Sequence, residues 1–333
     1  MKKLGLLFLY VFQLSCTSQT NPKINGVSFV SSREKAKQED VNSIKEIHAN
    51  HAAVMPFGFV RAVNSPEIIF NTDRQWYGET ELGAAQYVNL LQQNTIGILL
   101  KPQLWIKGGA FTGTLKMNTE ADWVALENTY ETFILTYANL AQKAHVNIFC
   151  IGTELEQFVS HRPEYWHALI SKIRKVYSGK LTYAANWDEY PKVPFWKELD
   201  FIGIDAYFPL SESKSPSVEE LKIAWQPWKT KIKEFSATTK KPVLFTEFGY
   251  RSMDYTAKKP WLVDRNEEFV NVIAQANALE ALLSVLWKEE WFAGGYVWKW
   301  FLNHEHAGGN MDNRFTPQNK PAQKVLKSFY EIH

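Results

Sequence analysis

The feature that most constrains this chain is an alternation of short apolar segments with helical patterns, repeated eight times along 333 residues. Short continuous apolar strands followed by helices are typical of a parallel sheet whose faces are covered by helices. Eight such units in a chain of this length favour a closed barrel over an open sheet. An open doubly wound sheet would carry a Gly-rich phosphate loop after its first strand, and residues 27–32 contain no glycine. The sequence therefore predicts an α/β fold, a (β/α)8 TIM barrel in a single domain.

The predicted elements follow from periodicity and from end signals. Strands are predicted over the apolar segments 24–30, 52–60, 96–106, 146–152, 181–187, 201–208, 242–245 and 294–301. Helices are predicted over 38–50, 79–93, 120–144, 264–289 and 321–330, with two more opened by Pro163 and by a capping box at Ser217. No linker or low-complexity stretch divides these units, which favours one domain.

Two of the predicted strands end in a Thr-Glu pair, at Glu154 and Glu247. An ionised carboxylate loses hydration in an apolar environment, so a Glu at the end of a buried strand is a candidate for chemistry. Functional residues of such barrels lie at the carboxyl ends of the strands. The fourth and seventh strands lie on opposite sides of the ring, so the two Glu can face each other across its mouth. Two facing carboxylates suit glycoside hydrolysis, in which one is the acid and the other attacks the anomeric carbon.

Other polar and aromatic side chains also end the predicted strands. Lys101 and Gln103 belong to the third strand. The chain contains 13 Trp, 14 Tyr and 21 Phe, and flat aromatic faces suit the C–H faces of sugar rings. Each Trp could equally belong to the core, and the Asn and Asp could bind substrate hydroxyls or tie loops together. The candidate substrate-binding residues are Trp105, Asn186, Trp187, Asp205, Tyr207 and Trp298.

The chain from about residue 24 to 330 resembles glycoside hydrolase family 113, a clan A family of (β/α)8 barrels whose known members are mostly β-mannanases. The motifs that carry the resemblance are Ile151-Gly-Thr-Glu-Leu-Glu156, Asp200-Phe-Ile-Gly-Ile-Asp-Ala-Tyr-Phe-Pro-Leu210, Phe245-Thr-Glu-Phe-Gly-Tyr250 and Phe315-Thr-Pro-Gln-Asn-Lys-Pro-Ala322.

This resemblance implies that residues 21–333 form a retaining glycoside hydrolase domain, with a β-glycan such as mannan as substrate and no cofactor. Glu154 is then the acid/base and Glu247 the nucleophile. Many clan A enzymes carry Asn before the acid/base, and Thr153 stands there in this chain, as in family 113. The hydrogen bond that the Asn gives to the sugar 2-hydroxyl must then be supplied differently. Tyr207 is the Tyr nearest to the nucleophile by strand order.

The clan also indicates two further roles. It favours Trp298, at the end of the eighth strand, as a sugar platform. Arg61, which follows the second strand, is a candidate to steady the nucleophile as an Arg does elsewhere in the clan.

Several alternatives stay open at this point. Glu156 could be the acid instead of Glu154, because the two alternate along a segment expected to be extended. The substrate could be another β-linked glycan, or the barrel could bind glycan without hydrolysing it. The segment His304-Glu-His306 lacks a third, separated ligand, so we interpret it as loop residues and predict no metal site.

Residues 1–20 are predicted to be a lipoprotein signal peptide and tether. Lys2 and Lys3 precede an apolar segment, 4–12, which is too short to anchor the chain across a bilayer. The Ser-Cys16 pair resembles the end of a bacterial lipobox, in which the Cys is lipidated and becomes the mature N-terminus. The alternative is an ordinary secretion signal cleaved nearby. The protein is therefore expected to be exported and anchored to a membrane through Cys16, at the cell surface or in the periplasm.

Charge and cysteine content bear on other partners. The formal net charge is +2, from 37 basic and 35 acidic side chains, and no basic block disturbs this balance. That pattern disfavours nucleic acid as a partner. The second of the two cysteines, Cys150, lies in an apolar strand and is expected to be a buried thiol. No disulfide framework is then possible, and the oligomeric state is not indicated.

Overall fold

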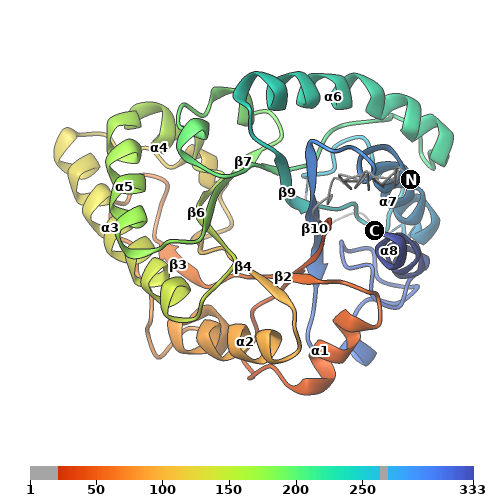
Figure 1. The fold of residues 1–333 in the computed structure, drawn as a ribbon, viewed down its shortest axis with the longest axis horizontal. Coiled ribbons are helices and arrows are strands. Elements are labelled where there is room, and N and C mark those ends of the chain that lie inside the picture. Colours follow the sequence, from red (N-terminus) through yellow and green to blue (C-terminus); the bar gives the residue numbers. More distant parts are fainter. Residues whose placement is uncertain (1–21, 263–268) are drawn as a thin grey trace, which may run out of the picture.

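Parallel strands close into a barrel in a computed structural model that describes residues 22–262 and 269–333 (Figure 1). The order around the ring is β1-β10-β9-β8-β7-β6-β4-β2. The predicted (β/α)8 TIM barrel is confirmed. The barrel strands are β1 (Ile24–Phe29), β2 (His51–Val54), β4 (Gly97–Leu100), β6 (Ile148–Thr153), β7 (Lys180–Asn186), β8 (Ile202–Asp205), β9 (Val243–Phe248) and β10 (Phe292–Trp300).

The predicted signal peptide, including Cys16, lies outside the described residues. Among the described residues, no helix is long and apolar enough to cross a membrane.

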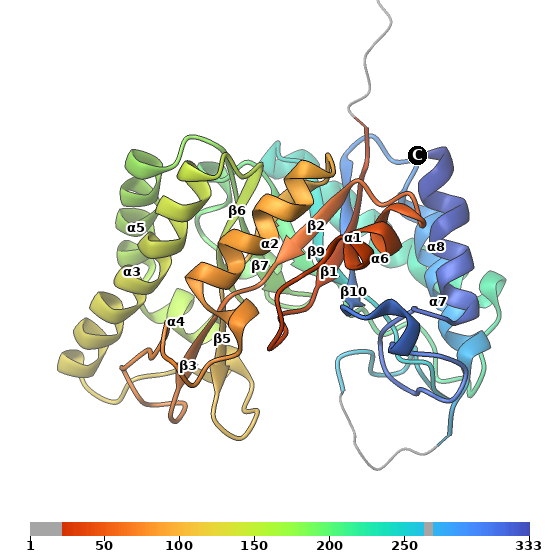
Figure 2. The ribbon, with the colours of Figure 1, turned by 90° about the horizontal axis from the view of Figure 1, so that it is seen from below.

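Segments 52–60 and 96–106 each form two strands, where the sequence predicts one. Their second halves, β3 (Phe57–Val60) and β5 (Gln103–Ile106), pair with each other in a separate parallel sheet. Pro56 and Pro102 stand between the halves, and proline has no N–H with which to continue a ladder. Figure 2 shows β3 and β5 continuing beyond one end of the barrel. The two-stranded sheet therefore extends the barrel wall on the side where the strands end.

Helices cover the outside of the barrel, and several begin at a side-chain cap. The hydroxyl of Thr119, for example, accepts the N–H of Asp122 at the start of the longest helix. The capping box predicted at Ser217 does cap a helix, and its hydroxyl accepts the N–H of Glu220. The helices are α1 (Gln38–Lys45), α2 (Glu81–Gln93), α3 (Glu120–Lys143), α4 (Glu156–His161), α5 (Pro163–Val176), α6 (Val218–Thr239), α7 (Val272–Leu286) and α8 (Pro321–Ile332).

Three features of the helical layer differ from the prediction. The helix predicted over 264–289 begins at Val272, capped by Asn271, and residues 264–268 of that prediction lie outside the described part of the chain. The short helix α4 follows directly after the fourth barrel strand. Between β7 and β8 the chain makes two short 3-10 turns, Tyr190–Lys192 and Trp196–Glu198.

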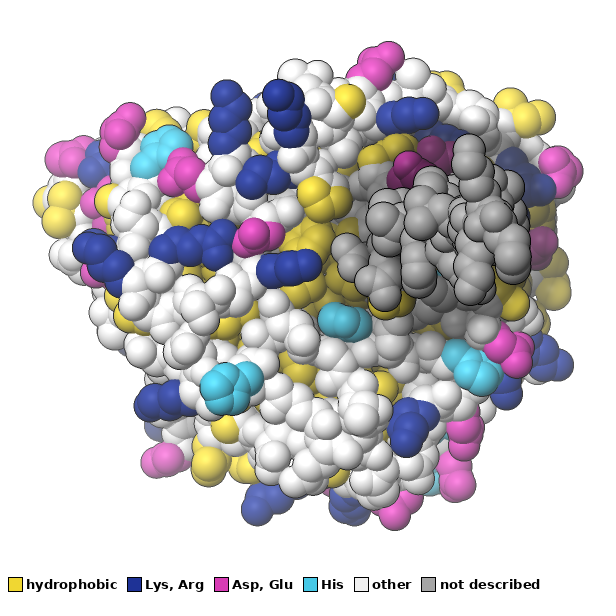
Figure 3. Space-filling view, viewed as in Figure 1, with side chains coloured by type: hydrophobic (Ala, Val, Ile, Leu, Met, Phe, Trp, Pro, Cys, Tyr) yellow, Lys and Arg dark blue, Asp and Glu magenta, His cyan; other side chains and the backbone are white. Residues whose placement is uncertain are grey.

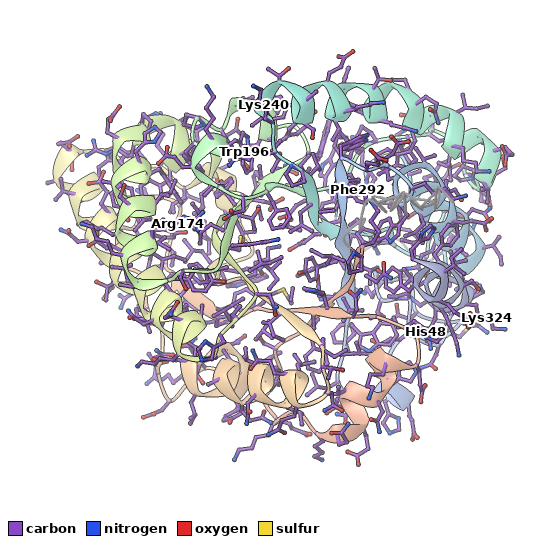
Figure 4. The ribbon with its side chains drawn as sticks, in the orientation of Figure 1. His48, Arg174, Trp196, Lys240, Phe292 and Lys324 are labelled. Atoms are coloured by element: carbon purple, nitrogen blue, oxygen red, sulfur yellow. The ribbon has the colours of Figure 1, made fainter. Side chains whose placement is uncertain are left out.

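Two apolar clusters form the core. The larger one lies between the strands and the helices, and a smaller one fills the inside of the barrel, where it includes Cys150, Leu244 and Tyr296. Cys150 is fully buried, as the sequence predicts. In Figure 4, Phe292 lies within the molecule as a member of the larger cluster, whereas Lys240 and Lys324 lie at the periphery. Because side chains fill the barrel, polar groups that act on a ligand must gather at its ends.

Basic and acidic side chains are interspersed on the face of the molecule shown in Figure 3, outside the area covered by undescribed residues. This distribution agrees with the near balance of 37 basic and 35 acidic residues in the chain.

Candidate active site

The carboxylate of Glu247, near the carboxyl end of β9, receives three hydrogen-bond donors. Lys101 Nζ lies 2.5 Å from Oε1, and Gln103 Nε2 donates to the same oxygen at 3.1 Å. The hydroxyl of Tyr207 donates to Oε2 at 2.7 Å. Only 6% of Glu247 is exposed, so these donors replace the water that the carboxylate gives up. They also hold each of its two oxygens in place.

Lys101 is fully buried between two carboxylates. Its Nζ atom contacts Glu247 Oε1 and lies 3.4 Å from Asp205 Oδ1. Burial acts to lower the pKa of Lys101, but the charges of Asp205 and Glu247 outweigh it and the pKa is raised. Lys101 is therefore a cation fixed at the base of the site.

Asp205 completes this charge cluster from the end of β8. Its Oδ1 atom accepts the hydroxyl of Thr246 at 2.7 Å, in addition to the contact with Lys101. Burial, together with the charge of Glu247, raises the pKa of Asp205 to about 7, against the opposing effect of Lys101. The Asp205 side chain is completely buried. It lies beneath the site, out of contact with solvent, although the sequence places it among the candidate substrate contacts.

Glu154 directly follows β6 and has a left-handed backbone conformation, with φ of 50°. Its N–H donates to the carbonyl oxygen of Ala184 on β7 at 2.7 Å. Burial raises the pKa of Glu154 well above its ordinary value, and the carboxylates of Asp205 and Glu247 raise it further. The fold thus brings Glu154 and Glu247 into electrostatic contact from strands on different sides of the ring, and it favours the protonated form of Glu154.

Glu156 has different surroundings. The segment after Glu154 is helical from Glu156 onward, not extended as the sequence predicts. The carboxylate of Glu156 pairs with Lys192 Nζ at 2.6 Å.

Two of the remaining candidate residues, Asn186 and Trp187, contact one another and the loops around the end of β7. Asn186 is half-buried, and its side-chain oxygen accepts the N–H of Trp187 in a local turn. Trp187 stacks on Trp261 with ring centres 5.2 Å apart and also meets Phe208 edge to face. These contacts tie the end of β7 to neighbouring loops.

Two candidate Trp residues are more open. Trp298, near the end of β10, is half-buried, and Lys299 Nζ lies 5.5 Å from its ring centre. Trp105 is 49% exposed on β5 and lines a cavity of about 340 Å³ together with Phe59, Arg61 and Ile69. The extra sheet therefore places an aromatic face beside a hollow outside the barrel.

The contact predicted for Arg61 is wrong. Its guanidinium lies on the surface, 3.8 Å from Glu67, and the cation that touches Glu247 is Lys101. A signal was available in the sequence, because a Lys inside an apolar strand is rarely buried without an anionic partner. Glu189 is a buried carboxylate that sequence reasoning missed.

Comparison with known families is decisive for the class of this protein. The family described as Glycoside Hydrolase Family 113 matches residues 28–320. The chain belongs to glycoside hydrolase family 113. This family 113 protein is accordingly a glycoside hydrolase, and the resemblance inferred from its motifs is confirmed. A search of curated proteins found no match.

Solved structures share the fold of this family 113 enzyme. One, described as a complex structure of a family 113 β-1,4-mannanase, is 20% identical, with a TM-score of 0.81 over 94% of this chain and 100% of that chain. The β-mannanase AaManA from Alicyclobacillus acidocaldarius, in complex with ManMIm, is 22% identical with a TM-score of 0.79, over 93% and 98% of the two chains. A β-glucuronidase of Faecalibacterium prausnitzii is more distant, at 17% identity and a TM-score of 0.58 over 88% of this chain and 45% of that one.

Proposed function

We propose that this family 113 enzyme hydrolyses β-1,4-mannan or manno-oligosaccharides with retention, with Glu154 as acid/base and Glu247 as nucleophile. One observation carries the proposal. A carboxyl group whose pKa is raised by burial interacts electrostatically with a second carboxylate that is held by Lys101, Gln103 and Tyr207. Two carboxyl groups with such different surroundings are suited to acid and nucleophile roles.

The first chemical step uses both residues at once. Glu154 gives its proton to the glycosidic oxygen of the leaving group, while an oxygen of Glu247 bonds to the anomeric carbon. Lys101 and Tyr207 hold that carboxylate so that its attacking oxygen needs little reorientation. The product is a glycosyl ester of Glu247, and the leaving sugar departs with the proton.

The second step follows from the change of charge. Once Glu247 is esterified, it no longer carries the negative charge that helps to raise the pKa of Glu154. The pKa of Glu154 then falls, so the residue can take a proton from water as that water attacks the anomeric carbon. Both Glu return to their starting protonation states. Asp205 contacts Lys101 from the end of β8, which is a supporting role and not a contact with sugar.

The substrate assignment rests on the family and on the surroundings of the site. Structures that share the fold are described as β-mannanases, one of them in complex with ManMIm. We assign Trp105, Trp298 and Trp187, with Asn186, to subsites around the catalytic pair. Trp105 would stack on a more distant sugar, because it lies on the extra sheet and half of its surface is open.

Hydrolysis of β-1,4-mannan and manno-oligosaccharides by the purified protein tests this function. We expect Glu247→Gln to abolish turnover and Glu156→Gln, a neighbouring carboxylate paired with Lys192, to retain it. The first sugar anomer released, followed by NMR, should be the β form. Release of the α anomer would contradict retention. If the wild type hydrolyses only a different β-glycan, the substrate assignment is wrong and the proposed reaction type still holds.

We also propose that residues 1–20 direct export and that Cys16 anchors the enzyme to a membrane through lipid. The support is the sequence pattern of two Lys, a short apolar segment and Ser-Cys16. Growth with a clickable fatty acid should label the wild type, and Cys16→Ser should remove the label. A wild type that is exported without label would favour an ordinary secretion signal.

A further inference from the structure

Glu189 is a buried carboxylate outside the charge cluster of the site. It is 1% exposed, and both of its oxygens are hydrogen-bonded. Oε1 accepts the hydroxyl of Tyr183 at 2.7 Å and Oε2 accepts the N–H of Asn186 at 3.0 Å. None of the ion pairs formed among the described residues includes Glu189. A carboxylate without a cation is costly to bury, so its retention calls for an explanation.

A chain of hydrogen bonds leads from Glu189 to the backbone beside Glu154. The N–H of Leu155, the residue after Glu154, donates to the Tyr183 hydroxyl at 2.6 Å. A hydroxyl has one hydrogen, and that of Tyr183 goes to Glu189. Each hydrogen bond in this series therefore points from donor to acceptor toward the Glu189 carboxylate, which is the final acceptor.

The backbone at Glu154 needs such support. With φ of 50° it is in the left-handed region, which residues other than glycine rarely adopt unless their surroundings hold them there. The peptide group before it is held by the Ala184 carbonyl, and the one after it by Tyr183. Because φ sets the direction of the Cα–Cβ bond, these two hydrogen bonds determine where the Glu154 carboxyl group points.

We propose that Glu189 is a positioning residue for acid catalysis, which acts through Tyr183 and the Leu155 N–H to hold Glu154 aimed at the leaving-group oxygen. This inference rests on the proposed function of Glu154. It adds a residue to the machinery without placing Glu189 in contact with substrate.

Glu189 also contributes to the electrostatics of the acid. Three charged groups act on Glu154 from the strand ends: Asp205 on β8, Glu247 on β9 and Lys101 just after β4. Glu189 acts on it from the loop after β7. Burial is the first cause of the raised pKa of Glu154, and the charge of Glu189 adds to it. Glu189 in turn has its pKa raised to about 7, first by burial and then by Glu156 and Asp205, against its two hydrogen bonds. A neutral residue at position 189 should therefore lower the pKa of Glu154.

A purely structural role would look different. Glu189 precedes a 3-10 turn, and its carboxylate accepts the N–H of Asn186, which braces the turn between the end of β7 and that 3-10 turn. If this were its whole purpose, a substitution would lower stability and would affect all substrates alike.

The test compares two aryl β-mannobiosides, one with a phenol leaving group and one with 2,4-dinitrophenol, which departs without protonation. Glu189→Gln keeps the size of the side chain but cannot accept both hydrogen bonds. We therefore expect kcat/KM for the phenyl substrate to fall about tenfold or more, because general acid catalysis contributes about 10²–10⁴-fold to the rate. The kcat/KM for the dinitrophenyl substrate, which reports the first step alone, should change little. The alkaline limb of the phenyl pH profile should move to lower pH. Tyr183→Phe, which breaks the same chain, should show the same selective loss.

Asp40→Asn is the matched control. Asp40 is 4% exposed, and its two oxygens accept the N–H groups of Lys37 and Asn303 on the other side of the ring. It should lower thermal stability without discriminating between leaving groups.

Each outcome has a distinct meaning. An equal loss on both substrates, with the alkaline limb unmoved, would overturn the positioning role and leave the proposed function intact. If Glu189→Gln does not fold, the positioning role is judged from Tyr183→Phe, by whether its loss of activity is confined to the phenyl substrate. If the wild type hydrolyses a different β-glycoside, the same pair of leaving groups is used on that sugar. A wild type that hydrolyses no β-glycoside would overturn both proposals.

Discussion

Lys101 Nζ lies 2.5 Å from Glu247 Oε1, with the Lys side chain completely buried. Lys101 directly follows β4 and Glu247 lies on β9, so the contact spans the inside of the barrel mouth. A cation at this position holds the Glu247 carboxylate, the proposed nucleophile, in a fixed orientation. This contact leads to the first of four predictions.

Lys101→Met removes the charge and keeps the length of the side chain. We expect kcat/KM to fall about 100-fold or more, the scale of losing one fixed electrostatic group in an active site. Steady-state kinetics on manno-oligosaccharides measures this, with thermal unfolding to verify the fold. Lys324→Met, on the exposed face of α8, is the control. Unchanged kcat/KM in Lys101→Met would contradict the role of the cation.

Tyr207→Phe removes the hydrogen bond to Glu247 Oε2 and nothing else from the carboxylate. A hydrogen bond to a charged group contributes about 1.5–3 kcal/mol, so kcat/KM should fall about 10- to 100-fold. Tyr255→Phe, at a Tyr that is 48% exposed, should leave the rate unchanged. Equal rates for wild type and Tyr207→Phe would show that the bond is not used in the reaction.

The pH dependence of stability follows from Asp205. Its pKa rises from 3.8 to about 7 on folding, first because of burial. Between about pH 4 and pH 7 the folded state therefore holds more protons than the unfolded state, and the free energy of unfolding falls as pH rises through this window. The pKa values of Glu154 and Glu189 are also raised by burial and contribute in the same direction, so Asp205→Asn should reduce this slope without abolishing it. Denaturant unfolding at a series of pH values measures it, and an unaltered slope would contradict the assignment.

Trp105→Ala tests the outer hollow beside β5. The Trp is 49% exposed, so stability should hold, while KM for long manno-oligosaccharides should rise about tenfold from the loss of stacking on one sugar. The shortest substrates should be unaffected, because they do not reach this wall. Trp76→Ala, also exposed at 44%, is the control. An equal effect on KM for short and long substrates would contradict the assignment of Trp105 to a distant subsite.

The barrel and its pair of Glu were predictable from sequence because the signals are local. Apolar segments alternate with helical patterns, and Glu154 and Glu247 each end such a segment. Strand order then predicts that the two meet, since parallel strands of a closed barrel end on the same side. The breaks at Pro56 and Pro102 carry a local signal too, and they explain why two predicted strands became four.

The partners of those Glu depend on the three-dimensional fold. Lys101 and Arg61 both follow early strands, and the chain itself does not say which one turns inward. Glu189 lies 35 residues after Glu154 (189 − 154), in a loop with no motif. Its link to the backbone beside Glu154 passes through a Tyr on a neighbouring strand. Such contacts join residues distant in sequence, and a few ångströms of packing decide them, so periodicity and spacing do not encode them.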